Sequence, residues 1–297
     1  MPSYDNPYIL EAKRYVQKFQ SVGSHECFYY PTSHEEAREL FKLFLEEKFP
    51  SYGTYQDAID MGPSPLFHSL ISSSLNIGLL DLEEVIEKAL HADAPFNAKE
   101  GFIRQIIGWR EFMFSLYKRL GRRQRTSNFF GFERTLSDQM KNGTSGIVPL
   151  DRINTKVLET SYSHHIERLM VQGNLFLLTE TAPDAVYRYF MSHYIDAYDW
   201  VMVGNVYGMS QYADGGLITT KPYISSSNYL TKMSYYPKSQ GWNRVWDALY
   251  WRFMFLYSDR FATNPRMKMQ RSLMAKMSKS VLQEHCRIGD EFLERLC

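Results

Sequence analysis

The segment SYSHHIERLMVQGN, residues 161–174, holds the densest group of side chains that could do chemistry. His164 and His165 are adjacent, and Arg168 follows His164 by four residues, one turn later on a helix. Neighbouring side chains on a helix diverge by about 100°, so the two imidazoles are poorly placed to share one metal ion. A helical zinc site usually needs histidines four residues apart and a further ligand. We therefore predict no metal site, and the pair is open to two interpretations: acid–base groups, or helix residues with local hydrogen bonds.

Aromatic residues and cations give two further signals. The chain of 297 residues has 19 Phe, 21 Tyr and 5 Trp, which core packing explains but which also suits stacking on bases or on a flavin ring. KRLGRRQR, residues 118–125, carries five cations, either as a solvated helix end or as phosphate contacts. The chain has no GxGxxG loop, P-loop or GxSxG elbow. A nucleotide cofactor would therefore be held by helix ends and side chains.

The net charge of +1 is the sum of two opposite regions. Residues 1–100 contain 8 Lys/Arg and 16 Asp/Glu, a balance of −8, whereas residues 215–279 contain 11 Lys/Arg and 2 Asp, a balance of +9. A positive region of this size favours a polyanionic partner such as nucleic acid, because bound phosphates release their counterions. An accidental asymmetry of a solvated surface is the alternative.

Cysteine usage and hydropathy indicate the cellular compartment of the protein. Cys27, Cys286 and Cys297 show no paired spacing, which excludes a disulfide framework and a cysteine metal cluster. No uninterrupted apolar run approaches the ~18 residues of a membrane span, and the first residues lack the basic start and apolar run of a signal peptide. We expect a cytoplasmic protein with no membrane partner.

Apolar residues recur at helical spacing along most of the chain, and no segment alternates at period two. Ser33 and Asp81 stand at the starts of two such segments as N-caps. At least seven helices are predicted, in residues 33–49, 80–92, 100–120, 153–174, 182–202, 243–262 and 278–296. Connectors rich in Gly, Pro, Ser and Asn separate them, the longest being YADGGLITTKPYISSSNY. The chain is predicted to be one all-α domain with long loops that serve binding.

Several short sequence motifs, in this order, resemble those of one protein family. They are GTYQDAI, LFHSLISSSLNIGLL, EGFIRQIIGWREF, SYSHHIERLMVQGN, IDAYDWVMVGNVYGMSQYADGG, KPYISSSNY, KMS and NPRM. As a set they resemble the catalytic domain of the photolyase/cryptochrome superfamily, most of all the prokaryotic branch that includes the iron–sulfur (6-4) photolyases. The resemblance covers roughly residues 28–270. It divides the chain into an N-terminal extension, residues 1–27, and a helical FAD-binding domain of photolyase type, residues 28–297.

The resemblance implies a bent FAD and a set of residues around it. The implied cofactor-binding residues are His68, Ser69 and Ser72 at the phosphates, Gln105, Trp109 and Arg110 by the adenine and the exit to the lesion, Arg168 paired with a carboxylate, and Asp196 and Asn205 near the ribityl chain and flavin N5. The implied catalytic residues are His165, its neighbour His164, and Tyr223, which faces the flipped lesion.

The activity implied is that of a deoxyribodipyrimidine photolyase, a lyase that uses light and reduced FAD to repair UV-induced pyrimidine dimers. His165 favours (6-4) products, because their repair needs a proton transfer from a group with a near-neutral pKa. UV-damaged DNA would be the partner of a monomer, and the damaged bases would leave the stack to be repaired. The alternatives are a cryptochrome-like flavin photoreceptor that does not repair DNA, and a helical scaffold that has lost its flavin.

The sequence departs from the family at three places. The N-terminal α/β antenna domain is missing, which predicts a short form or half of a split protein that is completed by a separate antenna-domain chain. Pro149, Pro237, Gln240 and Arg244 stand where that branch has its cluster cysteines, so no iron–sulfur cluster is expected. Lys141 and Tyr189–Phe190 replace the usual aromatic electron relay. Photoreduction would then be slow, lost, or routed through Trp200, Trp246 or Trp251.

Overall fold

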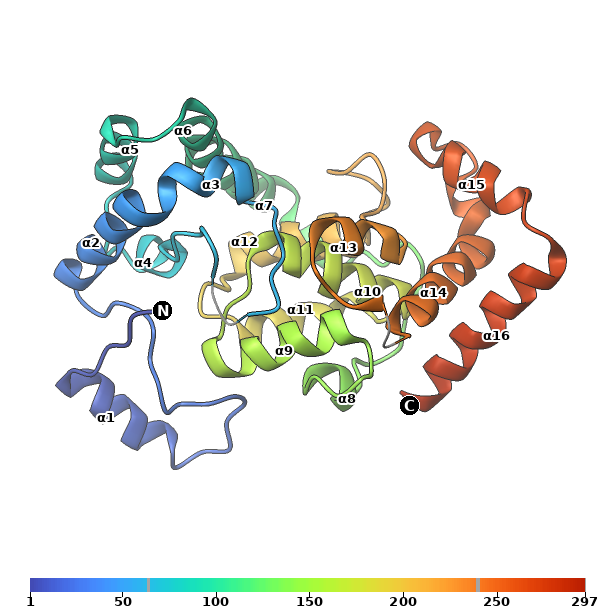
Figure 1. The fold of residues 1–297 in the computed structure, drawn as a ribbon, viewed down its shortest axis with the longest axis horizontal. Helices are drawn as coiled ribbons and strands as arrows, with labels where there is room; N and C mark the ends of the chain where they lie inside the picture. The colour runs from blue at the N-terminus through green and yellow to red at the C-terminus, as the bar shows by residue number, and fades with distance from the viewer. Residues whose placement is uncertain (63–64, 239–240, 297) are drawn as a thin grey trace.

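The computed structural model describes residues 1–62, 65–238 and 241–296, and its regular structure is helical, as predicted (Figure 1). Within these ranges the only β pairing is an isolated bridge between Arg134 and Thr181. The first half of the chain contains α1 (Pro7–Val16), α2 (His34–Leu43), η1 (Phe44–Lys48), α3 (Phe49–Tyr55), α4 (Ser72–Asn76), α5 (Leu82–His91), α6 (Phe96–Ile103), η2 (Arg104–Trp109), α7 (Arg110–Arg125) and α8 (Asp138–Lys141).

The second half supplies the rest of the fold. It contains α9 (Val148–Thr160), η3 (Glu167–Gly173), α10 (Asn174–Leu178), α11 (Pro183–His193), α12 (Asp199–Val203), η4 (Gly204–Ser210), α13 (Ser227–Met233), α14 (Trp242–Tyr257), η6 (Ser258–Phe261), η7 (Pro265–Met267), α15 (Lys268–Ala275) and α16 (Lys279–Arg295). The segments η1 to η4 are π-helical, whereas η6 and η7 are 3-10 turns.

Two predicted helix starts are confirmed by their caps. Ser33 and Glu36 form a reciprocal capping box at α2, and the Asp81 carboxylate accepts the backbone N–H groups of Glu83 and Glu84 at α5. Each cap satisfies amide donors that have no partner inside the helix, and such a cap stabilises a helix by about 1 kcal/mol.

Two predicted helices were wrong in extent, because each is broken in the middle. The stretch 153–174 breaks after α9, where Ser161 takes a left-handed backbone with φ of 53°. The chain is extended up to His164 before it re-enters a helix. The stretch 182–202 breaks between α11 and α12, and Asp196 lies in the intervening turn. The apolar spacing continues through both breaks because the side chains on either side pack into one core.

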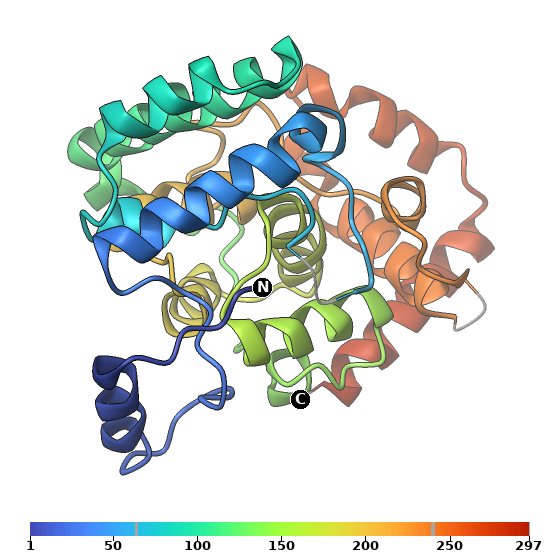
Figure 2. The ribbon, with the colours of Figure 1, turned by 60° about the vertical axis from the view of Figure 1, so that its left-hand side comes forward.

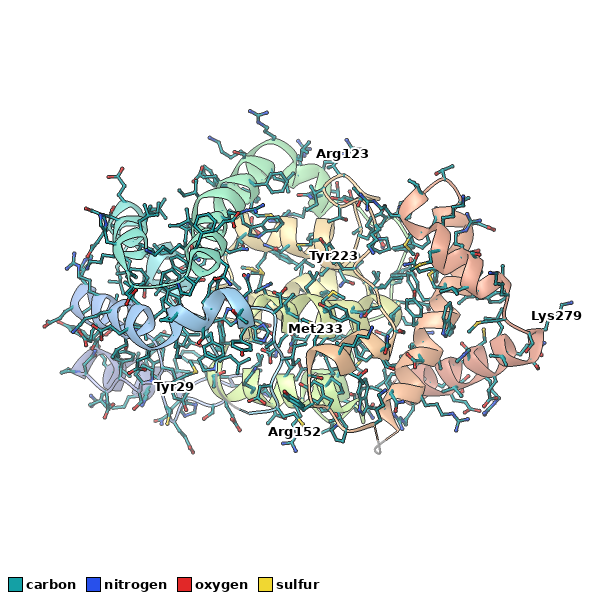
Figure 3. The ribbon with its side chains drawn as sticks, turned by 45° about the horizontal axis from the view of Figure 1, so that its top comes forward. Tyr29, Arg123, Arg152, Tyr223, Met233 and Lys279 are labelled. Carbon is teal, nitrogen blue, oxygen red and sulfur yellow. The ribbon has the colours of Figure 1, made fainter. Side chains whose placement is uncertain are left out.

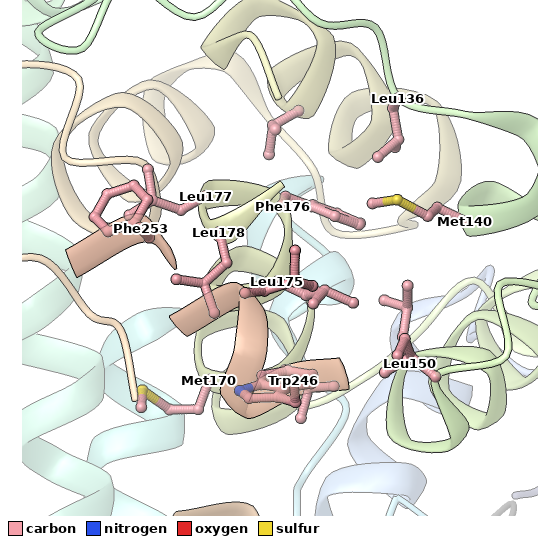
Figure 4. Close-up of a cluster of buried hydrophobic side chains, with 14 of the residues drawn as sticks. Leu136, Met140, Leu150, Met170, Leu175, Phe176, Leu177, Leu178, Trp246 and Phe253 are labelled. Atoms are coloured by element: carbon pink, nitrogen blue, oxygen red, sulfur yellow. The ribbon is translucent and has the colours of Figure 1, made fainter. Parts of the chain in front are cut away.

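That core is the larger of two main apolar clusters. It is built around α10, whose Leu175, Phe176, Leu177 and Leu178 are fully buried between α9, α11 and α14 (Figure 4). The second cluster joins α2, η1, α3, α5 and α6, and its rings Phe44, Phe49 and Phe102 meet at tilted and edge-to-face angles.

The helices form three groups in space. α2, α3 and α5 to α7 lie on one side, α8 to α13 lie in the middle, and α14 to α16 form the opposite end (Figures 1 and 2). α14 and α16 pack side by side, and Arg252 of α14 binds Asp290 of α16 at 2.6 Å. The N-terminal segment with α1 projects at the edge of the first group and is joined to it by Asn6, whose amide donates to Thr32 at 2.6 Å.

Candidate functional site

A cavity of about 520 Å³ lies where the first helical group meets the middle group. Residues of α3, α4, α6, η2 and α7 line one wall, and residues of η3, α12, η4 and the turn before α12 line the other. All nine residues that the resemblance assigns to FAD lie on its surface, together with one of the three assigned to catalysis: His68, Ser69, Ser72, Gln105, Trp109, Arg110, Arg168, Asp196, Asn205 and His165.

Among the described residues, three of the four π-helical segments supply much of this lining. Gln105 and Trp109 lie in η2, Arg168 lies in η3, and Asn205 lies in η4. A π turn holds one more residue than an α turn, so it redirects the side chains, and such turns are frequent at functional sites. η3 and η4 also approach closely, because a Cβ added to Gly173 would lie 2.7 Å from the Cβ of Ser210.

The loop before α4 forms a strained edge of the cavity. Leu66 and Leu70 both have positive φ, 51° and 61°, which costs a non-glycine residue about 1–3 kcal/mol. This backbone brings the neighbouring His68, Ser69 and Ser72 to the cavity surface. The His68 Nε2 lies 3.0 Å from the carbonyl oxygen of Gln56, which fixes the ring against the end of α3.

Arg168 and Asp196 form a rigid polar patch on the opposite wall. The guanidinium donates to both carboxylate oxygens of Asp196, at 2.9 and 3.0 Å, and its Nε donates to the Ser163 carbonyl at 2.7 Å. The Tyr194 ring lies 4.2 Å from the guanidinium carbon. Asp196, Tyr194 and Tyr162 together raise the pKa of Arg168 against the opposing effect of burial. The pair therefore stays charged and oriented.

Other lining groups combine flat rings with amides. Arg110 donates to the Asn76 side chain at 2.9 Å and stacks over the Trp200 ring at 4.9 Å. The Asn205 amide nitrogen donates to the Val201 carbonyl one turn earlier, at 2.8 Å. Its amide oxygen is then the atom with which Asn205 can accept a hydrogen bond from a ligand.

The histidines differ sharply in their surroundings. His164 is 2% exposed and does not line the cavity, whereas the His165 side chain is 49% exposed at the rim and its Nε2 lies 3.0 Å from Asp57 Oδ1. Burial lowers the pKa of His68 to about 3, and it lowers that of His164 well below the usual value. The hydrogen bond from His165 lowers the pKa of Asp57. His165 is thus the histidine that solvent and a ligand can reach.

In the sequence, only His164 and His165 are close enough to be compared as metal ligands. Their rings are 6.1 Å apart and inclined at 68°. The loop before α4 adds His68, whose ring stacks on that of His164 at 4.7 Å and 9°. One ring nitrogen from each of the three lies within 4.8 Å of the others.

A buried ion pair, which the sequence did not reveal, lies next to the His164 ring. Lys156 of α9 binds both carboxylate oxygens of Glu167, at 2.5 and 2.7 Å, and the Glu167 carboxylate also accepts the backbone N–H of His164 at 3.1 Å. The two side chains are 9% and 1% exposed. Burial raises the pKa of Glu167 even though Lys156 lowers it.

The other residues singled out in the sequence differ in whether they line the cavity. Tyr223, in the long loop after η4, is half-buried against the main core (Figure 3). Of the relay positions, Lys141 binds Asp138 at 2.9 Å, Tyr189 is buried and Phe190 lines the cavity. Trp200 also lines it, while Trp246 is buried in the main core and Trp251 packs against that core.

The predicted basic segment, residues 118–125, forms the C-terminal end of α7. Lys118, Arg119, Arg122, Arg123 and Arg125 are all exposed, and Arg123 projects outward at the edge of the molecule (Figure 3). Arg125 binds Asp199 and stacks on Tyr187. The other four cations have no acidic partner within the described residues. This helix end therefore offers free positive charge to a polyanion.

The positions aligned with the cluster cysteines have ordinary structural roles where they are described. Pro149 is buried in the first turn of α9, and Arg244 binds Glu284 at 3.0 Å. Pro237 accepts a hydrogen bond from the Trp242 indole at its carbonyl, at 2.9 Å. Gln240 and Cys297 lie outside the described residues.

Comparison with known proteins supports the family that the motifs indicate. No family model matches the chain. The sequence is 38% identical to the (6-4) photolyase of Agrobacterium fabrum over 289 residues, which cover 93% of this chain and 57% of that protein. The fold matches the crystal structure of a bacterial class III photolyase from Agrobacterium tumefaciens with a TM-score of 0.55 and 16% identity, covering 89% of this chain and 54% of the other. These similarities support the photolyase/cryptochrome superfamily and its prokaryotic (6-4) branch, as the motifs predict.

The chain spans little more than half the length of both relatives. It also matches two short uncharacterised proteins of Acanthamoeba polyphaga mimivirus. R855 is 42% identical over 127 residues, all of that protein and 43% of this chain, and R853 is 37% identical over 102 residues, 78% of that protein and 33% of this chain. Within the described ranges, each helix is too short or too polar to cross a membrane.

Proposed function

We propose that this chain is the helical catalytic part of a light-driven DNA photolyase that binds FAD in the cavity and repairs UV-induced pyrimidine dimers, with (6-4) products favoured. One observation carries the proposal: a single cavity collects all nine residues that the family resemblance assigns to FAD. These residues come from segments that lie far apart in the sequence, from His68 to Asn205. The similarity to a protein named (6-4) photolyase supports the choice of lesion.

The chemistry of the lining fits FAD. A volume of about 520 Å³ falls within the usual range of cofactor sites. Ser69 and Ser72 offer hydroxyl donors for phosphate oxygens, while Leu75, Phe102 and Ile106 supply an apolar surface for flat rings. The Asn205 amide oxygen can accept the N–H that a flavin carries at N5 when reduced. Reduced FAD, when bound and excited by light, would supply the electron for repair.

The residues of the chain would then position the lesion and move one proton. His165 stands at the rim, where a flipped base can reach its ring. Asp57 orients that ring through its 3.0 Å hydrogen bond. Buried His68 and His164 stay neutral, so they pack beside His165 without carrying the exchangeable charge. The free cations at the end of α7 would bind DNA phosphates.

Absorption spectroscopy and a repair assay test the proposal in sequence. The purified protein, incubated with FAD, should show flavin bands that bleach under blue light with a reductant. It should then repair an oligonucleotide with one (6-4) product in light but not in darkness. A protein that binds and photoreduces flavin yet repairs neither (6-4) nor cyclobutane dimers would instead be a cryptochrome-like photoreceptor. A protein that binds no FAD would refute both assignments.

A matched pair of histidine variants tests the assigned proton donor. His165→Ala should abolish (6-4) repair and leave flavin binding unchanged, because the side chain is exposed and its hydrogen-bond partner among the described residues is Asp57. His91→Ala, at the exposed end of α5, should repair normally. Normal repair by His165→Ala would show that another group supplies the proton.

A further inference from the structure

His68, His164 and His165 form a cluster that the repair proposal uses only in part. His68 comes from the loop before α4, His164 ends the extended segment after α9, and His165 begins the helical turn that leads into η3. The His165 ring lies edge-on to the other two, 5.7 Å from His68 and 6.1 Å from His164. One ring nitrogen of each residue lies within 4.8 Å of those of the other two. Three imidazoles this close are a common ligand set for transition metals.

The outward hydrogen bonds of two rings match the pattern of metal-binding histidines. A ligating histidine usually donates its second ring N–H to a carbonyl or carboxylate, which fixes the tautomer. His68 makes such a contact from Nε2 to the Gln56 carbonyl, and His165 makes one from Nε2 to the Asp57 carboxylate, both at 3.0 Å. In each ring the nitrogen left for a metal is Nδ1.

His164 provides the independent evidence that this cluster is a binding site. Both of its ring nitrogens are buried and lack a hydrogen-bond partner. A buried polar nitrogen without a partner costs about 1–3 kcal/mol, so such an atom calls for an explanation. A metal ion bound between the three rings would satisfy one of these nitrogens.

The charges around the cluster allow a cation there. The His68 and His164 side chains are buried, and a histidine binds a metal through the lone pair of its neutral ring. The nearest buried cation, Lys156, is neutralised by Glu167, whose Oε2 lies 3.6 Å from His164 Nε2. Arg168 is likewise paired with Asp196. Asp57 contributes one negative charge at the open side.

We propose that His68, His164 and His165 bind one divalent transition-metal ion that prefers imidazole, such as Zn²⁺ or Co²⁺. A ligating histidine must be neutral, so the metal-bound state of His165 and its proton-donating state in repair exclude each other. Ligand bonds of about 2.0–2.1 Å in a tetrahedral site place nitrogens about 3.4 Å apart, so the rings must close by a small rotation. The exposed His165 is free to make it. Water at the open rim would complete the coordination. Mg²⁺ prefers oxygen ligands and is not expected at this cluster.

Calorimetry with Zn²⁺ tests the site in darkness without flavin or DNA, so its result is independent of the proposed repair. After treatment with a chelator, the full chain should bind one Zn²⁺, and Co²⁺ should give the absorption bands of a tetrahedral nitrogen site. His165→Ala should weaken Zn²⁺ binding at least 10-fold while the circular dichroism spectrum is unchanged. Asp57→Asn should weaken it about 10–100-fold, as loss of an outer-shell partner does.

Two control variants separate this site from other zinc ligands. His91→Ala and Cys27→Ser remove an exposed imidazole and an exposed thiol elsewhere, and both should bind Zn²⁺ as the unmodified chain does. Zn²⁺ binding that is absent, or that survives His165→Ala and His68→Gln, would overturn the proposal. Binding of Mg²⁺ that depends on Asp57 but not on the histidines would overturn it as well, in favour of a carboxylate site.

Discussion

Replacing Lys156 with Met tests how strongly the buried ion pair supports the histidine cluster. The substitution keeps most of the side-chain volume but leaves the Glu167 carboxylate, which is 1% exposed, without its cation. Its remaining partners are the His164 backbone N–H at 3.1 Å and the more distant charge of Arg168. Removing one member of a buried pair costs about 3–5 kcal/mol. For a chain of this length, the melting temperature should fall by about 5–8 °C.

The same variant has a predicted pH dependence. Burial already raises the pKa of Glu167, and loss of Lys156 raises it further. A group whose pKa is higher in the folded state stabilises the fold below its unfolded pKa, and this contribution is lost as the pH rises through the folded pKa. Lowering the pH from 7 to about 5 should therefore protonate Glu167 in the variant and shrink its deficit relative to the unmodified chain.

Urea unfolding at both pH values, followed by circular dichroism, measures these effects. Lys141→Met is the matched control, because it breaks the exposed pair with Asp138 by the same chemical change. It should alter the unfolding free energy by less than about 1 kcal/mol. The double variant Lys156→Met/Glu167→Gln should recover much of the loss, since no buried charge remains unpaired. A Lys156→Met deficit as small as that of the control, or one that grows at pH 5, would refute this reasoning.

Three further variants test other parts of the site. Asn205→Ala should lower the flavin midpoint potential by about 10–30 mV, because one hydrogen bond to the reduced form is lost; an unchanged potential in spectroelectrochemistry would remove Asn205 from N5. Arg168→Lys keeps the charge but loses the bidentate contact with Asp196. FAD, titrated by flavin fluorescence, should therefore bind about 10-fold more weakly to this variant, and an equal affinity would contradict the assignment. Arg122→Ala/Arg123→Ala should flatten the slope of log K for DNA against log salt by about 1.8, while an unchanged slope would place the DNA elsewhere.

Much of the fold could be predicted from local patterns. Ser33 and Asp81 marked helix starts correctly because a cap acts within four residues. The breaks at Ser161 and around Asp196 were missed, because apolar spacing reports burial and the residues on both sides of each break pack into one core. The π-helical turns carry no composition signal, so the sequence did not reveal them.

For the site, short motifs identified the lining but not the contacts between distant segments. The motif GTYQDAI was noted, yet nothing in it predicted that Asp57 would bind His165, which lies 108 residues further on. The pairing of Lys156 with Glu167 is equally invisible, since both residues read as solvated helix positions until α9 and η3 are packed together. Tyr223 lies outside the cavity lining with its ring packed on the main core, so its place opposite the lesion stays a prediction.

The position of the cavity explains why the site depends on long-range packing. Phe102 belongs to the smaller core, whereas Phe190 belongs to the larger one, and both line the same cavity. The histidine cluster spans the same boundary, with His68 on one side and His164 on the other, in direct ring contact. A shift between the two helical groups would therefore change the cofactor cavity and the spacing of the imidazoles together. Any flavin bound across this boundary would in turn stabilise the packing of the two groups, because a ligand favours the state to which it binds.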